Sequence, residues 1–216
     1  YGLNKLFFMK SKIFFLLLST IIILTSCSKN KDKLGGAPSP IGEEGVTFET
    51  SFGTIAGVSN AEASVISLEN GVSSISGSAT VTNSTIKNIL SNHPEATIDG
   101  NNVTLDGVEF RITTEGIEAV YGLEPGIIVK YDSNVGDKYN IGGGVTREVI
   151  AKSTDNDYFW GGMNIKVIQV EENTNKFGTK KIYYWANHRF GLVGIEFQFD
   201  DNSTAKFPIY ASAEND

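Results

Sequence analysis

The fold class is decided by the stretch Ala63-Ser-Val-Ile-Ser-Leu-Glu-Asn-Gly-Val-Ser-Ser-Ile-Ser-Gly-Ser-Ala-Thr-Val81. Apolar and polar residues largely alternate on both sides of Asn70-Gly71, and such alternation is typical of strands with one buried face. Both turn residues tolerate positive φ, which a two-residue type I′ turn requires. The stretch therefore predicts an antiparallel β-hairpin.

The same alternation continues through the rest of the chain. Turn residues such as Asp106-Gly107 and Glu115-Gly116 separate the apolar runs, as expected between antiparallel strands. We expect further strands in these segments: Val46 to Ile55, Val103 to Tyr121, Val145 to Ala151, Met163 to Val170, Lys181 to Ala186, Gly194 to Asp200 and Ala205 to Ala211. The sequence therefore predicts a mainly β fold with an antiparallel meander sheet, built either as a curved half-barrel or as two packed sheets.

One short helix is expected to interrupt the strands near residues 84–92. Ser84 can cap its start, and Pro94 prevents its continuation. Ile86, Ile89 and Leu90 share one helical face.

The best internal boundary is Gly122-Leu-Glu-Pro-Gly126, because glycine and proline interrupt the periodic pattern. It separates an N-terminal β half, residues 46–125, from a C-terminal β half, residues 126–216. An ordinary loop is equally compatible with this composition, so the halves form either one domain or two.

Near the start of the chain, a basic segment, an apolar run and small residues follow one another. Met9-Lys-Ser-Lys12 precedes the apolar run 13–24, and Thr25 and Ser26 precede Cys27, the only cysteine. This order is typical of an export signal, and the run is shorter than the about 20 residues that span a bilayer. Either an ordinary secretory signal or a lipid-attachment signal would have these parts.

The tetrapeptide Leu24-Thr-Ser-Cys27 resembles the lipobox of bacterial lipoproteins. The resemblance implies cleavage before Cys27 and attachment of acyl chains such as palmitate, which would anchor the protein to a membrane. Residues 1–8 are then expected to precede a natural start at Met9, and residues 9–26 to form the signal peptide. Residues 27–45, which lack an apolar period, are expected to form a lipidated flexible tether.

The resemblance also implies a location in the cell envelope of a Gram-negative bacterium. Ser28 after the cysteine resembles the pattern that sends lipoproteins to the outer membrane. The mostly basic residues 29–33 differ from the acidic run of surface-exported lipoproteins, which favours the periplasmic face over the outer surface.

Charge and cysteine content exclude several classes of function. Residues 1–26 contain three lysines and no acid, so the remainder carries 15 basic and 25 acidic side chains, a net charge of −10. Such a charge disfavours nucleic acid as a partner. With one cysteine, a disulfide within the chain and a thiolate metal site are excluded, and we expect neither a metal nor a cofactor.

Part of the C-terminal half is similar to uncharacterised β-rich lipoproteins of Gram-negative bacteria. The similarity covers roughly residues 131–210 and lies in Tyr131-Asp-Ser, Gly162-Met-Asn-Ile-Lys-Val167 and Tyr183-Tyr-Trp-Ala-Asn-His-Arg-Phe-Gly-Leu-Val193. It implies antiparallel strands of a curved sheet and carries no catalytic residue with it.

The candidate binding residues are aromatic. Tyr158 and Trp160 lie in one aromatic cluster, and Tyr184 and Trp185 lie in another, near His188. Exposed rings beside turns could stack on a glycan or anchor a protein partner. The alternative is that these rings fill a β core, where aromatic residues are common.

These observations favour a non-catalytic binding or structural domain that engages a glycan or another envelope protein. One rival is a carrier that holds a lipid in an apolar pocket of the curved sheet. The other is a hydrolase of envelope polymer, which requires His188 and an acid in one cleft. Acidic pairs such as Glu171-Glu172 are expected in turns, where solvated polar residues are common.

Overall fold

Antiparallel strands build almost all of the computed structural model, which describes residues 34–50, 53–142 and 144–216. The described residues belong to one compact unit. Cys27 and the expected signal peptide lie outside the described residues, so lipid attachment stays a prediction. Within the described residues, no helix is long and apolar enough to cross a membrane.

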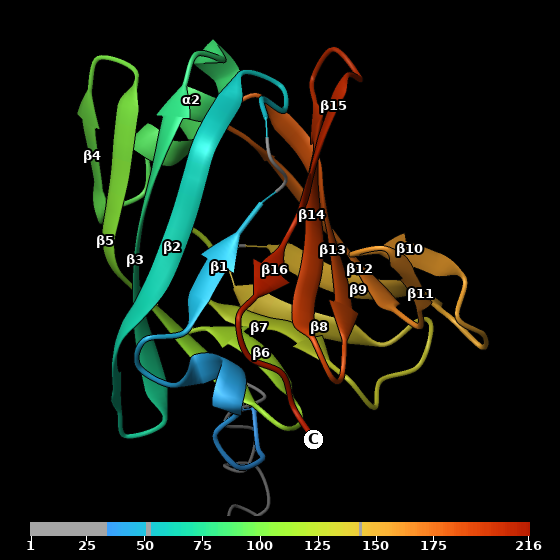
Figure 1. The fold of residues 1–216 in the computed structure, drawn as a ribbon. Coiled ribbons are helices and arrows are strands. Elements are labelled where there is room, and N and C mark those ends of the chain that lie inside the picture. The colour runs from blue at the N-terminus through green and yellow to red at the C-terminus, as the bar shows by residue number, and fades with distance from the viewer. Residues whose placement is uncertain (1–33, 51–52, 143) are drawn as a thin grey trace, which may run out of the picture. The chain divides into compact units, whose positions relative to one another are not determined.

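The first sheet is curled, and its strands follow the order β16-β1-β2-β3-β5-β6-β7, with β4 paired to β5 (Figure 1). Its strands are β1 (Thr47–Glu49), β2 (Val58–Glu69), β3 (Val72–Val81), β4 (Ala96–Asp99), β5 (Asn102–Thr113), β6 (Gly116–Ala119), β7 (Gly126–Lys130) and β16 (Tyr210–Ala211). All neighbouring strands are antiparallel, which confirms the predicted half-barrel of antiparallel strands.

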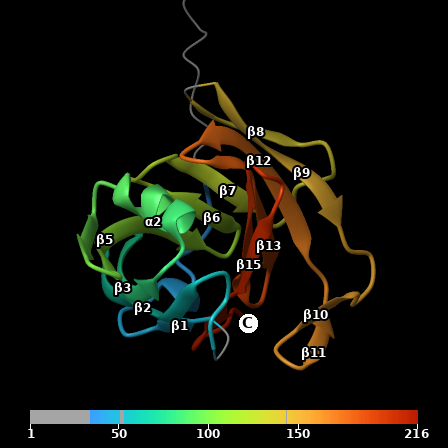
Figure 2. The ribbon, with the colours of Figure 1, turned by 90° about the horizontal axis from the view of Figure 1, so that it is seen from above.

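The second sheet follows the order β15-β14-β13-β12-β9-β8. Its strands are β8 (Lys138–Gly142), β9 (Val145–Lys152), β12 (Ile168–Lys176), β13 (Thr179–Asn187), β14 (Gly191–Phe199) and β15 (Thr204–Pro208). A separate hairpin, β10 (Tyr158–Trp160) and β11 (Met163–Ile165), projects beside it (Figure 2).

The turn between β2 and β3 has the predicted chemistry. Glu69 pairs with Val72, and the two residues between them, Asn70 and Gly71, have φ angles of 52° and 75°. Few residues other than glycine and asparagine adopt such positive φ angles readily. This dipeptide therefore sets the register of the hairpin.

The predicted helix is present as α2 (Ser84–Ser91), which lies across one end of the first sheet (Figures 1 and 2). Its cap is Asn83 rather than the expected Ser84, because the Asn83 side chain accepts hydrogen bonds from the N–H groups of Thr85 and Ile86. Ile86 is buried against strand residues of both sheets, among them Val103 and Phe207. The helix therefore closes one end of the space between the sheets.

Residues 34–45, the second part of the expected tether, pack against the sheets. Leu34 and Ile41 are buried, and Ile41 is the middle residue of the short 3-10 helix η1 (Pro40–Gly42). The buried hydroxyl of Ser39 donates to Asn215 Oδ1 at 2.6 Å. Contacts with residues far along the chain therefore order this segment, although its local composition has no apolar period.

One core joins the two sheets. The largest buried cluster contains Ile117 and Val129 from the first sheet together with Val149 and Val170 from the second. Strand β7 pairs within the first sheet, and β16 returns to it from the C-terminal end. The division between the two sheets therefore does not coincide with the sequence boundary between residues 125 and 126.

Candidate functional site

An apolar cavity of about 330 Å³ lies against the inner face of the first sheet. Side chains from β1, β2, β3, β5, β6, β7, η1, α2 and β14 line it, with Ile209 from the chain before β16. Its volume falls within the range of about 300–1,000 Å³ that is common for small-molecule sites.

Small residues in the centre of the sheet create this cavity. Phe48, Ala63, Gly77 and Leu105 form one row across β1, β2, β3 and β5, and all of them line the cavity. The two central members carry one methyl group or none, so the middle of the row is hollow. Two residues further along β3, on the same face of the sheet, Ala79 also lines the cavity.

Gly77 is required by close packing of the backbone. A Cβ atom at this position would lie 2.8 Å from the carbonyl oxygen of Glu62 and 2.9 Å from the Cβ of Ala63. Larger residues are therefore excluded by contact with β2. The pairing of β2 with β3 also has register shifts on both sides of this contact. The hollow at the centre of the row is thus a consequence of how β2 and β3 meet.

Three polar residues border the first cavity. Glu49, Glu62 and Ser78 line it and are exposed to solvent. Glu49 and Glu62 are direct partners across β1 and β2. Each is the chain neighbour of a residue in the inward row, so these side chains point to the opposite, solvent-facing side of the sheet, and the cavity itself is lined almost entirely by apolar groups.

A second cavity of about 250 Å³ adjoins the first. Phe110, Ile128 and Leu192 line both cavities, so these side chains lie at their junction. Helix α2 covers both, with Leu90 against the first and Ile89 against the second. The two cavities together extend between the sheets, from the first sheet towards β12 and β13.

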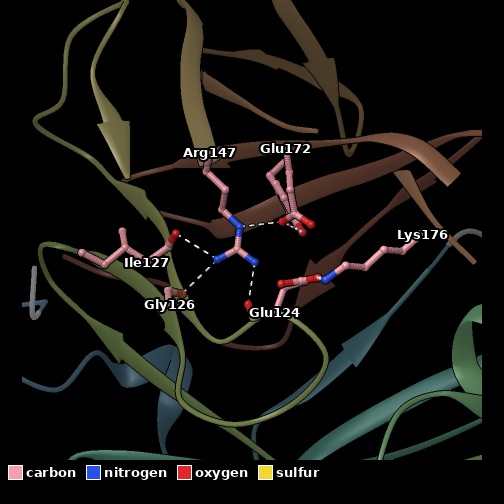
Figure 3. A network of polar contacts seen from close by, with 7 residues as sticks. Glu124, Gly126, Ile127, Arg147, Glu172 and Lys176 are labelled. Atoms are coloured by element: carbon pink, nitrogen blue, oxygen red, sulfur yellow. Dashed lines mark hydrogen bonds and ion pairs between the residues drawn. The ribbon is translucent and has the colours of Figure 1, made fainter. Parts of the chain in front are cut away.

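A buried ion pair forms one wall of the second cavity (Figure 3). Arg147 on β9 and Glu172 on β12 are cross-strand partners, with exposed fractions of 2% and 0%. Arg147 Nε donates to Glu172 Oε2 at 2.6 Å. Its other nitrogens donate to the carbonyl oxygens of Glu124, Gly126 and Ile127 at 2.7, 3.1 and 3.0 Å. The guanidinium thereby joins the second sheet to β7.

The carboxylate of Glu172 is only partly satisfied. Its Oε2 also accepts from the Tyr184 hydroxyl at 3.0 Å, and burial raises the pKa of Tyr184, so the phenol stays a neutral donor. Within the described residues, Glu172 Oε1 and Thr179 Oγ1 are buried without a hydrogen-bond partner. Both residues line the second cavity. Polar atoms in such a state are rare in folded proteins and are expected to have a partner.

The expectation that Glu171-Glu172 lie in a turn was wrong. Both residues lie within β12, where Ile168, Val170 and Glu172 alternate inward. Arg147 occupies the matching position between Val145 and Val149 in β9. The sequence did contain a signal for this ion pair. In each of the two segments, a charged residue stands at a position where the alternation predicts a buried apolar one.

Three of the candidate aromatic residues are buried. Trp160, which is 9% exposed, stacks on Tyr210 and contacts Phe190, with ring centroids 5.2 and 4.7 Å apart, and its Nε1 donates to Ile209 O at 3.0 Å. Trp185 and Tyr184 are also buried. Their positions favour the core role that the sequence left open.

Tyr158 packs on the outside of this aromatic core. Its ring is stacked with Trp185 at 6.2 Å, and the Lys206 ammonium lies 3.8 Å from the centroid of Trp185 and 4.8 Å from that of Tyr158. Burial lowers the pKa of Lys206, because an ammonium ion loses hydration against the rings. Phe159, which was not among the candidates, is instead 74% exposed.

His188 is exposed in the turn between β13 and β14. Its ring lies edge-on to Tyr131, with centroids 5.4 Å apart, and its carbonyl oxygen accepts from Asn215 Nδ2 at 2.6 Å. It lines neither cavity. The arrangement that the hydrolase hypothesis requires, with His188 and an acid in one cleft, is therefore not found in either cavity.

The other histidine, His93, lies at the rim of the second cavity. Its Nδ1 accepts a hydrogen bond from the Glu95 N–H at 3.2 Å, whereas Asn92 caps the end of α2. Burial lowers the pKa of His93, partly opposed by the charge of Glu95. The ring is therefore a neutral acceptor near neutral pH.

No group of three or more His, Cys, Asp or Glu side chains in residues 34–50, 53–142 and 144–216 is arranged to hold a metal ion. Comparisons with known protein families, with curated protein sequences and with solved structures found no match to this chain. The class of protein that the fold and the site define is an antiparallel β domain with an apolar interior cavity.

Proposed function

We propose that this protein binds a small apolar ligand in the cavity between its sheets, and that a lipid on Cys27 tethers the binding domain to an envelope membrane. The observation that carries the proposal is the cavity of about 330 Å³, which is lined almost entirely by apolar groups and is open to solvent. Of the functions considered from the sequence, the carrier has the strongest geometric support.

Energetics favour an occupant over an empty cavity. Protein interiors are close-packed, and enclosed voids cost about 24 cal/mol per Å³. The opening lets solvent reduce this cost, but an apolar ligand that fills the space removes it and restores dispersion contacts.

Filling the hollow with protein atoms is expected to abolish binding. Ala63→Leu and Ala79→Leu place extra methyl groups in the first cavity, so the affinity for a neutral apolar dye such as N-phenyl naphthylamine should fall at least about tenfold, or about 1.4 kcal/mol. The thermal midpoint should stay equal or rise, because the added groups occupy empty space. Fluorescence titration of residues 32–216 measures the affinity.

Ala151→Leu is the matched control, because Ala151 is an exposed residue of β9 outside both cavities. This variant should bind the dye as the wild type does. Dye affinity that is unchanged in all three variants would place the dye elsewhere and contradict the proposal. Native mass spectrometry of the gently purified protein should also retain an added mass of lipid size.

A second candidate is binding of a glycan or an envelope protein by the β10–β11 hairpin. Phe159 and Met163 are exposed on it next to the turn residues Gly161 and Gly162. Because an exposed phenylalanine adds little to stability, Phe159→Ser should leave the fold intact while reducing co-sedimentation with isolated envelope polymer several-fold. Equal sedimentation of variant and wild type would remove this candidate.

A further inference from the structure

We infer that the ligand is a long, narrow apolar chain, such as the alkyl or acyl chain of a lipid, which passes from the first cavity into the second. The inference rests on the proposed function and specifies the ligand class. The observation that carries it is that the two cavities lie end to end and share the apolar residues Phe110, Ile128 and Leu192.

The cavities follow one another along β5 and β6. On β5, Ile112 lines the first cavity, Val108 lines the second, and Phe110 between them lines both. On the paired strand β6, Ile117 lines the first cavity and Ala119 lines the second. Residues two apart in a strand share a face and are separated by roughly 7 Å. The two hollows therefore form an elongated space along these strands.

The junction between the cavities is bordered by side chains from three strands. Phe110 comes from β5, Ile128 from β7 and Leu192 from β14. Phe110 and Leu192 are only half-buried although they pack against the core cluster, so they keep accessible surface beside the cavities. An alkyl chain can pass such a junction because its torsions adopt several staggered states, whereas a fused ring system is wide and rigid.

The second cavity offers a ligand mainly apolar surface. Arg147, Glu172 and Thr179 contribute to its wall, but they are 2%, 0% and 2% exposed and so present almost no surface to an occupant. Ile195 and Phe197 also line it and are half-buried. A polar group placed there would lose its hydration without gaining a partner, whereas a methylene group is stabilised. The part of the ligand that enters this cavity is therefore apolar.

The volumes set the length of chain that needs both cavities. The first cavity, of about 330 Å³, is near the lower limit of about 300 Å³ for small-molecule sites, and the second, of about 250 Å³, is below it. If a methylene group takes about the 30 Å³ of a water molecule in the liquid, the first cavity holds roughly ten heavy atoms. A longer chain must extend into the second.

A series of straight-chain alcohols tests the inference. Hexanol, octanol, decanol, dodecanol and tetradecanol are each titrated, below their solubility limits, against bound N-phenyl naphthylamine. A methylene that leaves water for apolar surroundings contributes about fourfold in affinity, or about 0.8 kcal/mol, and ordering of the chain offsets part of this gain. We therefore expect the wild-type affinity to rise at least about tenfold from decanol to tetradecanol.

Matched alanine-to-leucine variants locate the far end of the chain. Ala119→Leu enlarges a residue that lines the second cavity and not the first, so it should weaken tetradecanol at least about tenfold and octanol less than about twofold. Ala79→Leu, in the first cavity, should weaken every alcohol. Ala151→Leu, outside both cavities, is the control and should change none. Each affinity is corrected for the affinity of the same variant for the dye.

A second variant of the same cavity guards against a folding defect. Ile195→Phe also enlarges a residue that lines the second cavity and not the first. It should reproduce the selective loss of tetradecanol if Ala119→Leu lowers the thermal midpoint.

The outcomes distinguish this inference from the proposed function. A wild-type affinity that stops rising at decanol would confine the ligand to the first cavity and overturn the inference, while apolar binding would stand. The inference would also fail if tetradecanol bound Ala119→Leu and Ile195→Phe as tightly as the wild type. Failure of the wild type to bind the dye or any of the alcohols would overturn the proposed function as well.

Discussion

Replacing Glu172 with alanine is expected to lower the free energy of unfolding by about 3–5 kcal/mol, the usual cost of removing one partner of a buried ion pair. The reason is that Arg147 would keep its charge at 2% exposure without a carboxylate. Its remaining donors reach only the neutral carbonyl oxygens of Glu124, Gly126 and Ile127. Urea denaturation, followed by circular dichroism, measures the change.

The double variant Arg147→Met/Glu172→Leu tests whether the loss comes from the uncompensated charge. Apolar replacements of similar volume remove both charges, so this variant should be considerably more stable than Glu172→Ala. The three carbonyl oxygens that accept from Arg147 lose their hydrogen bonds in this variant, so its stability should not return fully to that of the wild type.

Glu148→Ala provides the surface control. Glu148 follows Arg147 on β9 and pairs with Lys138 at 3.0 Å, with both side chains well exposed. Exposed pairs contribute about 0–1 kcal/mol, so this change should be small. A Glu172→Ala loss no larger than that of Glu148→Ala would mean that the Arg147 site is hydrated and that its charge is not isolated.

Trp160→Ala is expected to cost about 3–5 kcal/mol, as for other large aromatic residues removed from a core. The ring contacts Phe190 and Tyr210 and anchors the β10–β11 hairpin through its hydrogen bond to Ile209. Its loss leaves a cavity and an unpaired carbonyl oxygen. Denaturant titration gives the free energy, and tryptophan fluorescence from Trp185 reports whether the adjacent core stays packed.

The neighbouring residue is the control for this prediction. Phe159 differs from Trp160 by one position in the same strand, so its side chain points to the opposite face and is 74% exposed. Phe159→Ala should therefore change the stability by no more than about 0.5 kcal/mol. Equal losses in the two variants would contradict the assignment of Trp160 as the anchor of the hairpin.

Local patterns were sufficient to predict much of the fold. The hairpin at Asn70-Gly71 follows from turn chemistry and the helix from the spacing of Ile86 and Leu90, and both features lie within a few residues of sequence. The cap was assigned one residue late, since Asn83 and Ser84 are both good capping residues and only the backbone conformation distinguishes them.

The candidate site depended on contacts that local patterns do not contain. Pairing of Arg147 with Glu172 requires the register of β9 against β12. The packing of residues 34–45 likewise depends on the hydrogen bond from Ser39 to Asn215, which lies far along the chain. Alternation shows that a side chain points inward, but it does not show which residue lies opposite.

By itself, the sequence determined the antiparallel β class, the first hairpin and the short helix, because side-chain period and turn conformation act over a few residues. It also supports the prediction of a lipid anchor at Cys27, which lies outside the described residues. The tertiary structure decided that Trp160 is buried and Phe159 exposed, and that Ala63 and Gly77 leave a hollow. These properties depend on how distant strands pack, and packing is set by the complete arrangement of the sheets.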